Sequence, residues 1–99
     1  MIRGTTPTLK FVIPFDTSLL AAAYITLAQN DEVILEKELT ECECGERVLS
    51  VRLKQEETLQ LQCDCKTEIQ VRAKTQEGDI LASDIFVVDT ERILKDGVI

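Results

Sequence analysis

Four cysteines are the residues whose type and spacing come closest to a chemical site in this chain. They form two C-x-C units, Cys42-Glu43-Cys44 and Cys63-Asp64-Cys65, with eighteen residues between the units. Four thiolates can hold a tetrahedral zinc ion, and residues two apart in a strand point to the same face. Structural zinc sites, however, commonly place about two to four residues between paired cysteines, and Glu41, Glu43 and Asp64 would add negative charge to the site. A zinc-binding domain built on Cys42, Cys44, Cys63 and Cys65 is therefore the alternative hypothesis.

Packing in the core is the favoured role of the same cysteines. Cys63 and Cys65 continue an alternation of apolar residues that begins at Leu59 and Leu61. Free cysteine on such a face behaves as a small hydrophobic residue. The other unit, Cys42 and Cys44, alternates with glutamates and is also expected to face inward. Disulfides are a further alternative, which would require an oxidising compartment.

Histidine is absent, and this absence narrows the enzyme classes that the chain could belong to. Neither a Ser-His-Asp nor a Cys-His arrangement can be built, and nor can a histidine-based zinc centre. The eighteen acidic residues are spread along the chain, and Glu56 and Glu57 are expected to be solvated. We therefore expect no enzyme activity and no catalytic, cofactor-binding or metal-binding residue.

Composition indicates one globular domain over residues 1–99, because the hydrophobic share is 44% and the charged share 29%. The formal net charge of −7 disfavours binding to nucleic acid and to anionic membranes. No apolar run approaches the roughly 20 residues of a membrane span, and Met1 to Pro7 lacks the apolar stretch of a secretory signal. We therefore expect synthesis in the cytoplasm.

Alternation of apolar and polar residues is the dominant pattern, and it predicts strands with one buried face. Turn-forming residues recur every eight to twelve positions, as in an all-β sandwich or a small barrel with less than about a fifth helix. Residues 19–28 could instead form a helix, because the run Leu19–Ala23 has high helix propensity, but Tyr24-Ile25-Thr26-Leu27 favours a strand. A short helical turn is expected over 54–58. The predicted strands, about seven in number, cover residues 9–15, 21–28, 32–39, 49–53, 59–65, 68–74 and 80–88.

The last predicted strand, 80–88, is apolar on both faces and contains one charged residue, Asp84. Such a strand is expected to lie centrally in a sheet or to be covered by a partner. Ile93, Leu94, Val98 and Ile99 follow in a short C-terminal arm that the small domain cannot easily bury. These features predict a homo-oligomer, or binding to another protein, through the last strand and the arm.

Five stretches resemble a family of small prophage and bacteriophage structural proteins of Gram-positive bacteria. This family is similar to the immunoglobulin-like N-terminal domain of phage baseplate upper proteins. The resemblance implies an immunoglobulin-like sandwich, a place in the virion and contacts with other tail or baseplate proteins. None of the shared motifs carries chemistry, and the cysteine units are not part of the family pattern. The stretches are MIRGTTPTL (1–9), IPFD (13–16), LKQEETL (53–59), IQVR (69–72) and RILKDGVI (92–99).

Overall fold

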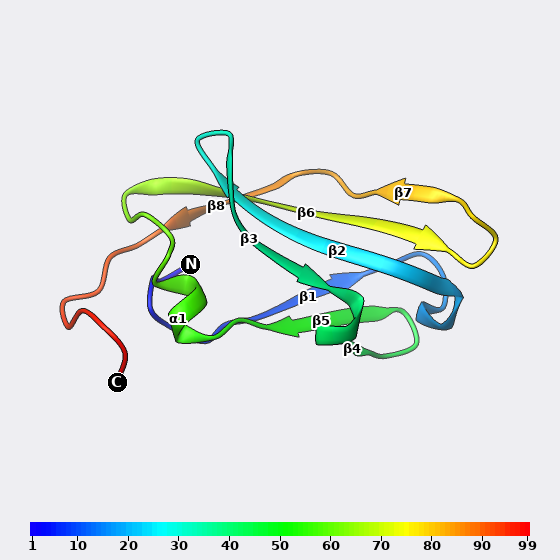
Figure 1. Ribbon diagram of the computed structural model, residues 1–99, viewed down its shortest axis with the longest axis horizontal. Helices are drawn as coiled ribbons and strands as arrows, with labels where there is room; N and C mark the ends of the chain where they lie inside the picture. Colours follow the sequence, from blue (N-terminus) through cyan, green and yellow to red (C-terminus); the bar gives the residue numbers. More distant parts are fainter.

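Two antiparallel sheets face each other in the computed structural model, which describes residues 1–99 (Figure 1). The smaller sheet has the order β1–β5–β4, with β1 at Thr8–Val12, β5 at Val48–Arg52 and β4 at Glu43–Cys44. The larger sheet has the order β3–β2–β6–β7, and β8 also pairs with β6. Its strands are β3 at Glu32–Glu38, β2 at Leu20–Gln29, β6 at Cys65–Thr75, β7 at Ile80–Ala82 and β8 at Phe86–Thr90. Helical turns are short: η1 at Thr17–Leu19, η2 at Leu39–Glu41 and α1 at Gln55–Thr58.

The order of the strands is that of an immunoglobulin-like sandwich, as predicted. In that nomenclature β1, β5 and β4 correspond to strands B, E and D, while β3, β2 and β6 correspond to C′, C and F. The β7–β8 edge takes the place of strand G. No strand pairs with the outer edge of β1, where strand A lies in immunoglobulin domains. Instead, Ile2 near the N-terminus forms a single parallel bridge with Glu91.

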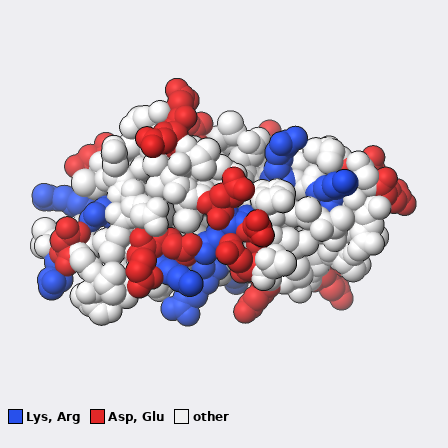
Figure 2. Space-filling model, viewed as in Figure 1, with Lys and Arg blue, Asp and Glu red and all other residues white.

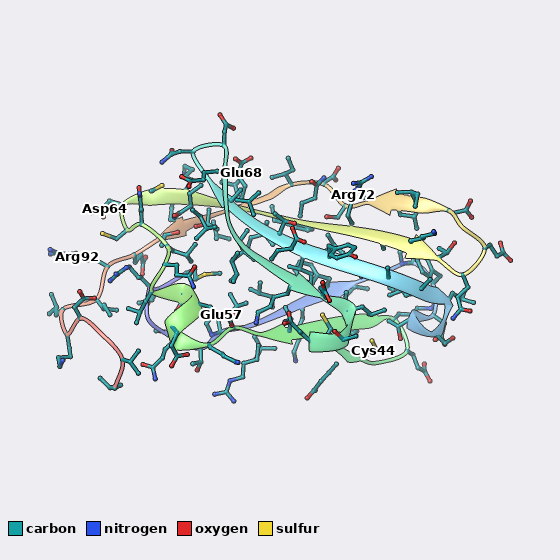
Figure 3. The ribbon with its side chains drawn as sticks, viewed as in Figure 1. Cys44, Glu57, Asp64, Glu68, Arg72 and Arg92 are labelled. Atoms are coloured by element: carbon teal, nitrogen blue, oxygen red, sulfur yellow. The ribbon has the colours of Figure 1, made fainter.

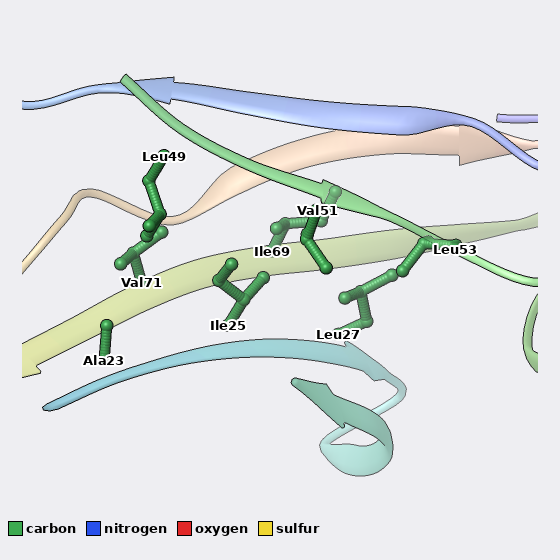
Figure 4. Packing of buried hydrophobic residues seen from close by; sticks show 8 residues of the cluster. All are labelled: Ala23, Ile25, Leu27, Leu49, Val51, Leu53, Ile69 and Val71. Atoms are coloured by element: carbon green, nitrogen blue, oxygen red, sulfur yellow. The ribbon is translucent and has the colours of Figure 1, made fainter. Parts of the chain in front are cut away.

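The core lies between the inner faces of β2, β6 and β5 (Figure 4). Ile25 and Leu27 of β2 and Leu49 of β5 have no exposed surface. The β2–β3 hairpin turns at Asn30 and Asp31, whose φ angles of 50° and 63° suit the tight turn that twisted antiparallel strands prefer. Residues 21–28 therefore lie in a strand, and the helical alternative is wrong.

The predicted strand over 59–65 is wrong. The chain leaves α1 in further helical turns, in which the Leu61 amide donates to the Thr58 carbonyl, and Leu61 is buried. Asp64, with a φ of 57°, then turns the chain into β6. Alternating leucines over so short a stretch can also come from a turn that covers the end of the core, and this arrangement is the one that forms here.

The last predicted strand is split into β7 and β8 by Ser83, Asp84 and Ile85. This split and β4, which the pattern does not predict, bring the number of strands to eight, although no separate strand forms over 59–65. The break is held in place, because the Val71 amide donates to Ser83 Oγ at 3.0 Å and the Ser83 amide donates to the Val71 carbonyl at 2.8 Å. The split strand lies at an edge, so a central position is wrong. The first strand ends at Val12, before Pro14, and is shorter than predicted.

The C-terminal arm, from Glu91 onward, has no helix or strand and folds back on its own domain. Arg3 donates to the Asp96 carboxylate at 2.8 Å, and the Gln55 side chain bonds the main chain of Ile99 through both its amide nitrogen and its oxygen, each at 3.0 Å. Leu94 and Ile99 remain exposed. The arm lies at the end of the molecule that carries α1, away from β7 (Figure 1).

Candidate interaction surface

An apolar groove opens between β1 and the β7–β8 edge, on the side of the sandwich where strand A is missing. Its volume is about 530 Å³, and twelve of its fifteen lining residues are hydrophobic. The opposite side is closed by the chain itself, because β3 passes through η2 into β4 and so joins the two sheets (Figure 1). We call this feature the open groove; its walls are Lys10–Phe15 on one side and Leu81–Ser83 with Phe86 on the other.

The β1 wall offers unpaired main-chain groups. The Leu53 amide donates to the Pro7 carbonyl and the Ile13 amide donates to the Arg47 carbonyl, both at 2.9 Å. In an antiparallel pair the bonded positions alternate, so the odd-numbered residues of β1 bond to β5. The N–H and C=O groups of Thr8, Lys10 and Val12 therefore face away from the sheet, available to another strand.

The β7 wall is a second free edge. Bonds from the Ser83 amide to Val71 and from the Thr75 amide to Asp79 show that residues 79, 81 and 83 are paired with β6. The main-chain groups of Ile80 and Ala82 consequently face outward. The open groove thus lies between two free strand edges, one from each sheet, and such edges are sites where further strands add.

Side chains that belong to the inner face of the sandwich are exposed in the open groove. Leu81 lies opposite Ala73 and Phe86 opposite Ile69, both of which pack in or against the core, yet Leu81 is 42% exposed and Phe86 48%. Phe86 meets Phe11 of β1 across the two sheets, with ring centroids 6.2 Å apart and a tilt of 43°. This contact joins the two walls of the groove at one point, and Leu81 and Phe86 remain partly open to solvent.

One charged group lies at each wall. Lys10 is the only charged residue among those that line the open groove, and Asp84 lies in the break beside the other wall. Both are exposed. The ion pairs of the structure are formed by other residues, so neither Lys10 nor Asp84 is neutralised within the chain.

The cysteines do not form a common site. Cys44 is exposed on β4, while Cys63 and Cys65 lie where the chain enters β6, near Asp64 at the other end of the molecule (Figure 3). All four are free thiols, and no group of three or more Cys, Asp or Glu side chains could hold a metal ion. The prediction that Cys63 packs in the core is wrong, because the strand that would have turned it inward does not form. Cys44 is not inward-facing either.

Cys42 comes closest to the predicted packing role. It is half-buried and packs against the core, and its thiol donates to the Glu38 carbonyl at 3.4 Å. Burial, together with the nearby Cys44 and Glu41, raises the pKa of the Cys42 thiol. The thiolate is the reactive form, so Cys42 is a poor nucleophile near neutral pH.

A buried ion pair, which sequence reasoning missed, joins β3 of the larger sheet to the helical turn α1. Lys37 of β3 is only 6% exposed and contacts the carboxylates of Glu57 on α1 and, at 3.9 Å, Glu41. Burial alone would raise the pKa of Glu57, but hydrogen bonds from the Lys37 ammonium and the Lys54 amide outweigh it, so the pKa is lowered. The prediction that Glu57 is a solvated carboxylate is therefore wrong. Acidic and basic side chains lie next to each other on this face of the molecule (Figure 2).

Comparison of the chain with protein-family models, with curated proteins and with solved structures gave no match in any of the three. None of the helices has the length and apolar character needed to cross a membrane.

Proposed function

We propose that this chain is a non-enzymatic structural module of a phage or prophage tail or baseplate, and that it acts through protein–protein contacts at the open groove. The observation that carries the proposal is the exposure of inner-face side chains, above all Leu81 and Phe86, between two unpaired strand edges. Isolated hydrophobic residues are common on surfaces, but a continuous apolar groove with unpaired main chain is typical of a binding site.

The phage context rests on the resemblance of five stretches, including MIRGTTPTL at 1–9 and RILKDGVI at 92–99, to small phage structural proteins. A protein partner is favoured over nucleic acid because the net charge is −7 and the open groove contains a single cation. Contacts with other tail or baseplate proteins, and with further copies of the chain, then place the protein in the virion after its synthesis in the bacterial cytoplasm.

Mass spectrometry of tail particles, purified after induction of the prophage, tests this function. We expect the wild-type chain in the particles at a fixed ratio to the tail proteins. A Leu81→Glu variant should be lost from them, because a carboxylate in the apolar groove opposes docking. A matched Val33→Glu variant, on the exposed outer part of β3, should be retained.

Two results would contradict the proposal. Absence of the wild-type chain from the particles removes the tail or baseplate role. Retention of a folded Leu81→Glu variant at the wild-type ratio removes the open groove as the contact surface.

A further inference from the structure

We propose that the open groove is closed by a second copy of this chain, in a two-fold dimer where β1 of each copy pairs with the β7–β8 edge of the other. This inference rests on the proposed function in taking the open groove as the contact surface, and it identifies the occupant. The result is two continuous sheets, each of which contains strands from both copies.

Strand direction allows this pairing. Within one chain, β1 runs opposite to β7 and β8 (Figure 1). A two-fold axis parallel to the strands exchanges the two layers and leaves strand directions unchanged, so β1 meets the partner's β7–β8 edge in antiparallel orientation. The outward main-chain groups of Lys10 and Val12 then face the break and the start of β8 in the partner, since Phe11 lies level with Phe86. Such a contact is isologous and closed, because each copy contributes both edges.

Charge favours this crosswise arrangement over the other two-fold dimer, in which like strand edges pair. If like edges paired, β1 with β1 and β8 with β8, the two Lys10 side chains would approach each other, and so would the two Asp84 side chains. A central lysine on an edge strand opposes pairing with a like edge. Crosswise pairing instead brings Lys10 of one copy toward Asp84 of the other, and both side chains lack an ion partner within the chain. Opposite charges across an interface select the matching arrangement.

The exposed surface of the chain is large enough to supply an interface of ordinary size. A monomeric protein of 11.1 kDa is expected to expose about 5,600 Å². This chain exposes 6491 Å², which is about 900 Å² more. One partner of a standard interface buries about 800 Å². Dimerisation through the open groove would cover Leu81 and Phe86 and bring the exposed area close to the expected value.

Charge reversal in the full-length chain tests the crosswise pairing, with the dissociation constant measured by analytical ultracentrifugation. We expect the wild type to have twice the 11.1 kDa monomer mass. Lys10→Glu and Asp84→Lys should each weaken the dimer by about tenfold or more, since two-fold symmetry introduces each repulsion twice. The combined K10E/D84K variant should recover affinity to within about threefold of the wild type. Both side chains are exposed, so these changes leave the core intact.

Two matched controls locate the contact. Glu36→Lys reverses an exposed charge on β3, at the other edge of the larger sheet, and Leu94→Asp alters an exposed residue of the arm. Neither should change the dissociation constant. Weakening by Leu94→Asp equal to that by Lys10→Glu would move the contact to the arm and overturn the proposal.

Three further results would overturn it: a wild-type monomer at high concentration, a dimer that resists both single reversals, or open-ended polymers in place of a dimer. A monomer that still enters tail particles in a Leu81-dependent manner would leave the proposed function intact. The experiments can therefore contradict the dimer without contradicting the proposed tail function.

Discussion

Replacing Glu57 with glutamine should destabilise the fold, because it leaves the buried ammonium of Lys37 without its main partner. The Lys37 side chain is 7% exposed and the Glu57 side chain 17%, so water cannot readily replace the lost carboxylate. Glutamine keeps the shape of glutamate and can still accept from the Lys54 amide, which donates to Glu57 at 2.8 Å. The variant therefore isolates the loss of charge.

The size of the effect follows from the surroundings of Lys37. A hydrogen bond to a charged group contributes about 1.5–3 kcal/mol, and breaking a fully buried pair from one side costs about 3–5 kcal/mol. Glu41 stays at 3.9 Å from Lys37 and part of the Glu57 carboxylate is open to water, both of which reduce the cost. We expect Glu57→Gln to lower the free energy of unfolding by about 2 kcal/mol.

Removal of Lys37, the other partner of the ion pair, should lower the free energy of unfolding by a smaller amount. Lys37→Met takes the buried charge away and fills its place with an apolar side chain, while Glu57 keeps the Lys54 amide and some contact with water. The expected cost is below about 1 kcal/mol, and the double variant should resemble Lys37→Met.

Urea unfolding followed by circular dichroism measures both effects, and Glu57→Gln should lower the midpoint by about 1 M. The pKa of Glu57 is lowered in the folded state, so its stabilisation is present above the unfolded pKa of about 4.3 and is lost as the pH falls through the folded pKa. The difference between wild type and Glu57→Gln should therefore shrink as the pH falls below about 5. A cost within about 0.5 kcal/mol, or a larger cost for Lys37→Met, would refute the argument.

Three further predictions concern the thiols, the core and the turns. In the folded protein a thiol reagent should label exposed Cys44 faster than half-buried Cys42, whose pKa is raised by burial; equal rates, measured by mass spectrometry, would contradict this. Ile25→Val, in a fully buried position, should cost about 0.5–1.5 kcal/mol in urea unfolding, whereas no change would mean that the core adapts freely. Gly78→Ala should cost about 1 kcal/mol because φ is +95°, whereas Gly45→Ala, with a nearest neighbour at 3.7 Å, should be near neutral in thermal melts.

Local pattern was a good guide to the elements in the middle of the sandwich. The alternation around Val51 and Ile69 predicted β5 and β6, since a strand with one buried face must repeat every two residues. The β-forming residues Tyr24-Ile25-Thr26-Leu27 predicted β2. Asn30 and Asp31 are turn-forming residue types, and both adopt a positive φ in the β2–β3 hairpin. Over residues 59–65 the same alternation failed, because Leu61 is buried from a turn and not from a strand.

The sequence by itself thus determined that the chain folds as an all-β sandwich, through its periodicity and its turn residues. Only the tertiary structure decided which strands are edges, because pairing joins segments far apart in the chain, such as β1 with β5. It also decided that Lys37 meets Glu57 and that the two cysteine units stay apart. The open groove belongs to this second kind of feature: an apolar residue such as Phe86 has the same side chain whether a neighbouring strand covers it or not, and only the completed sheets leave it exposed.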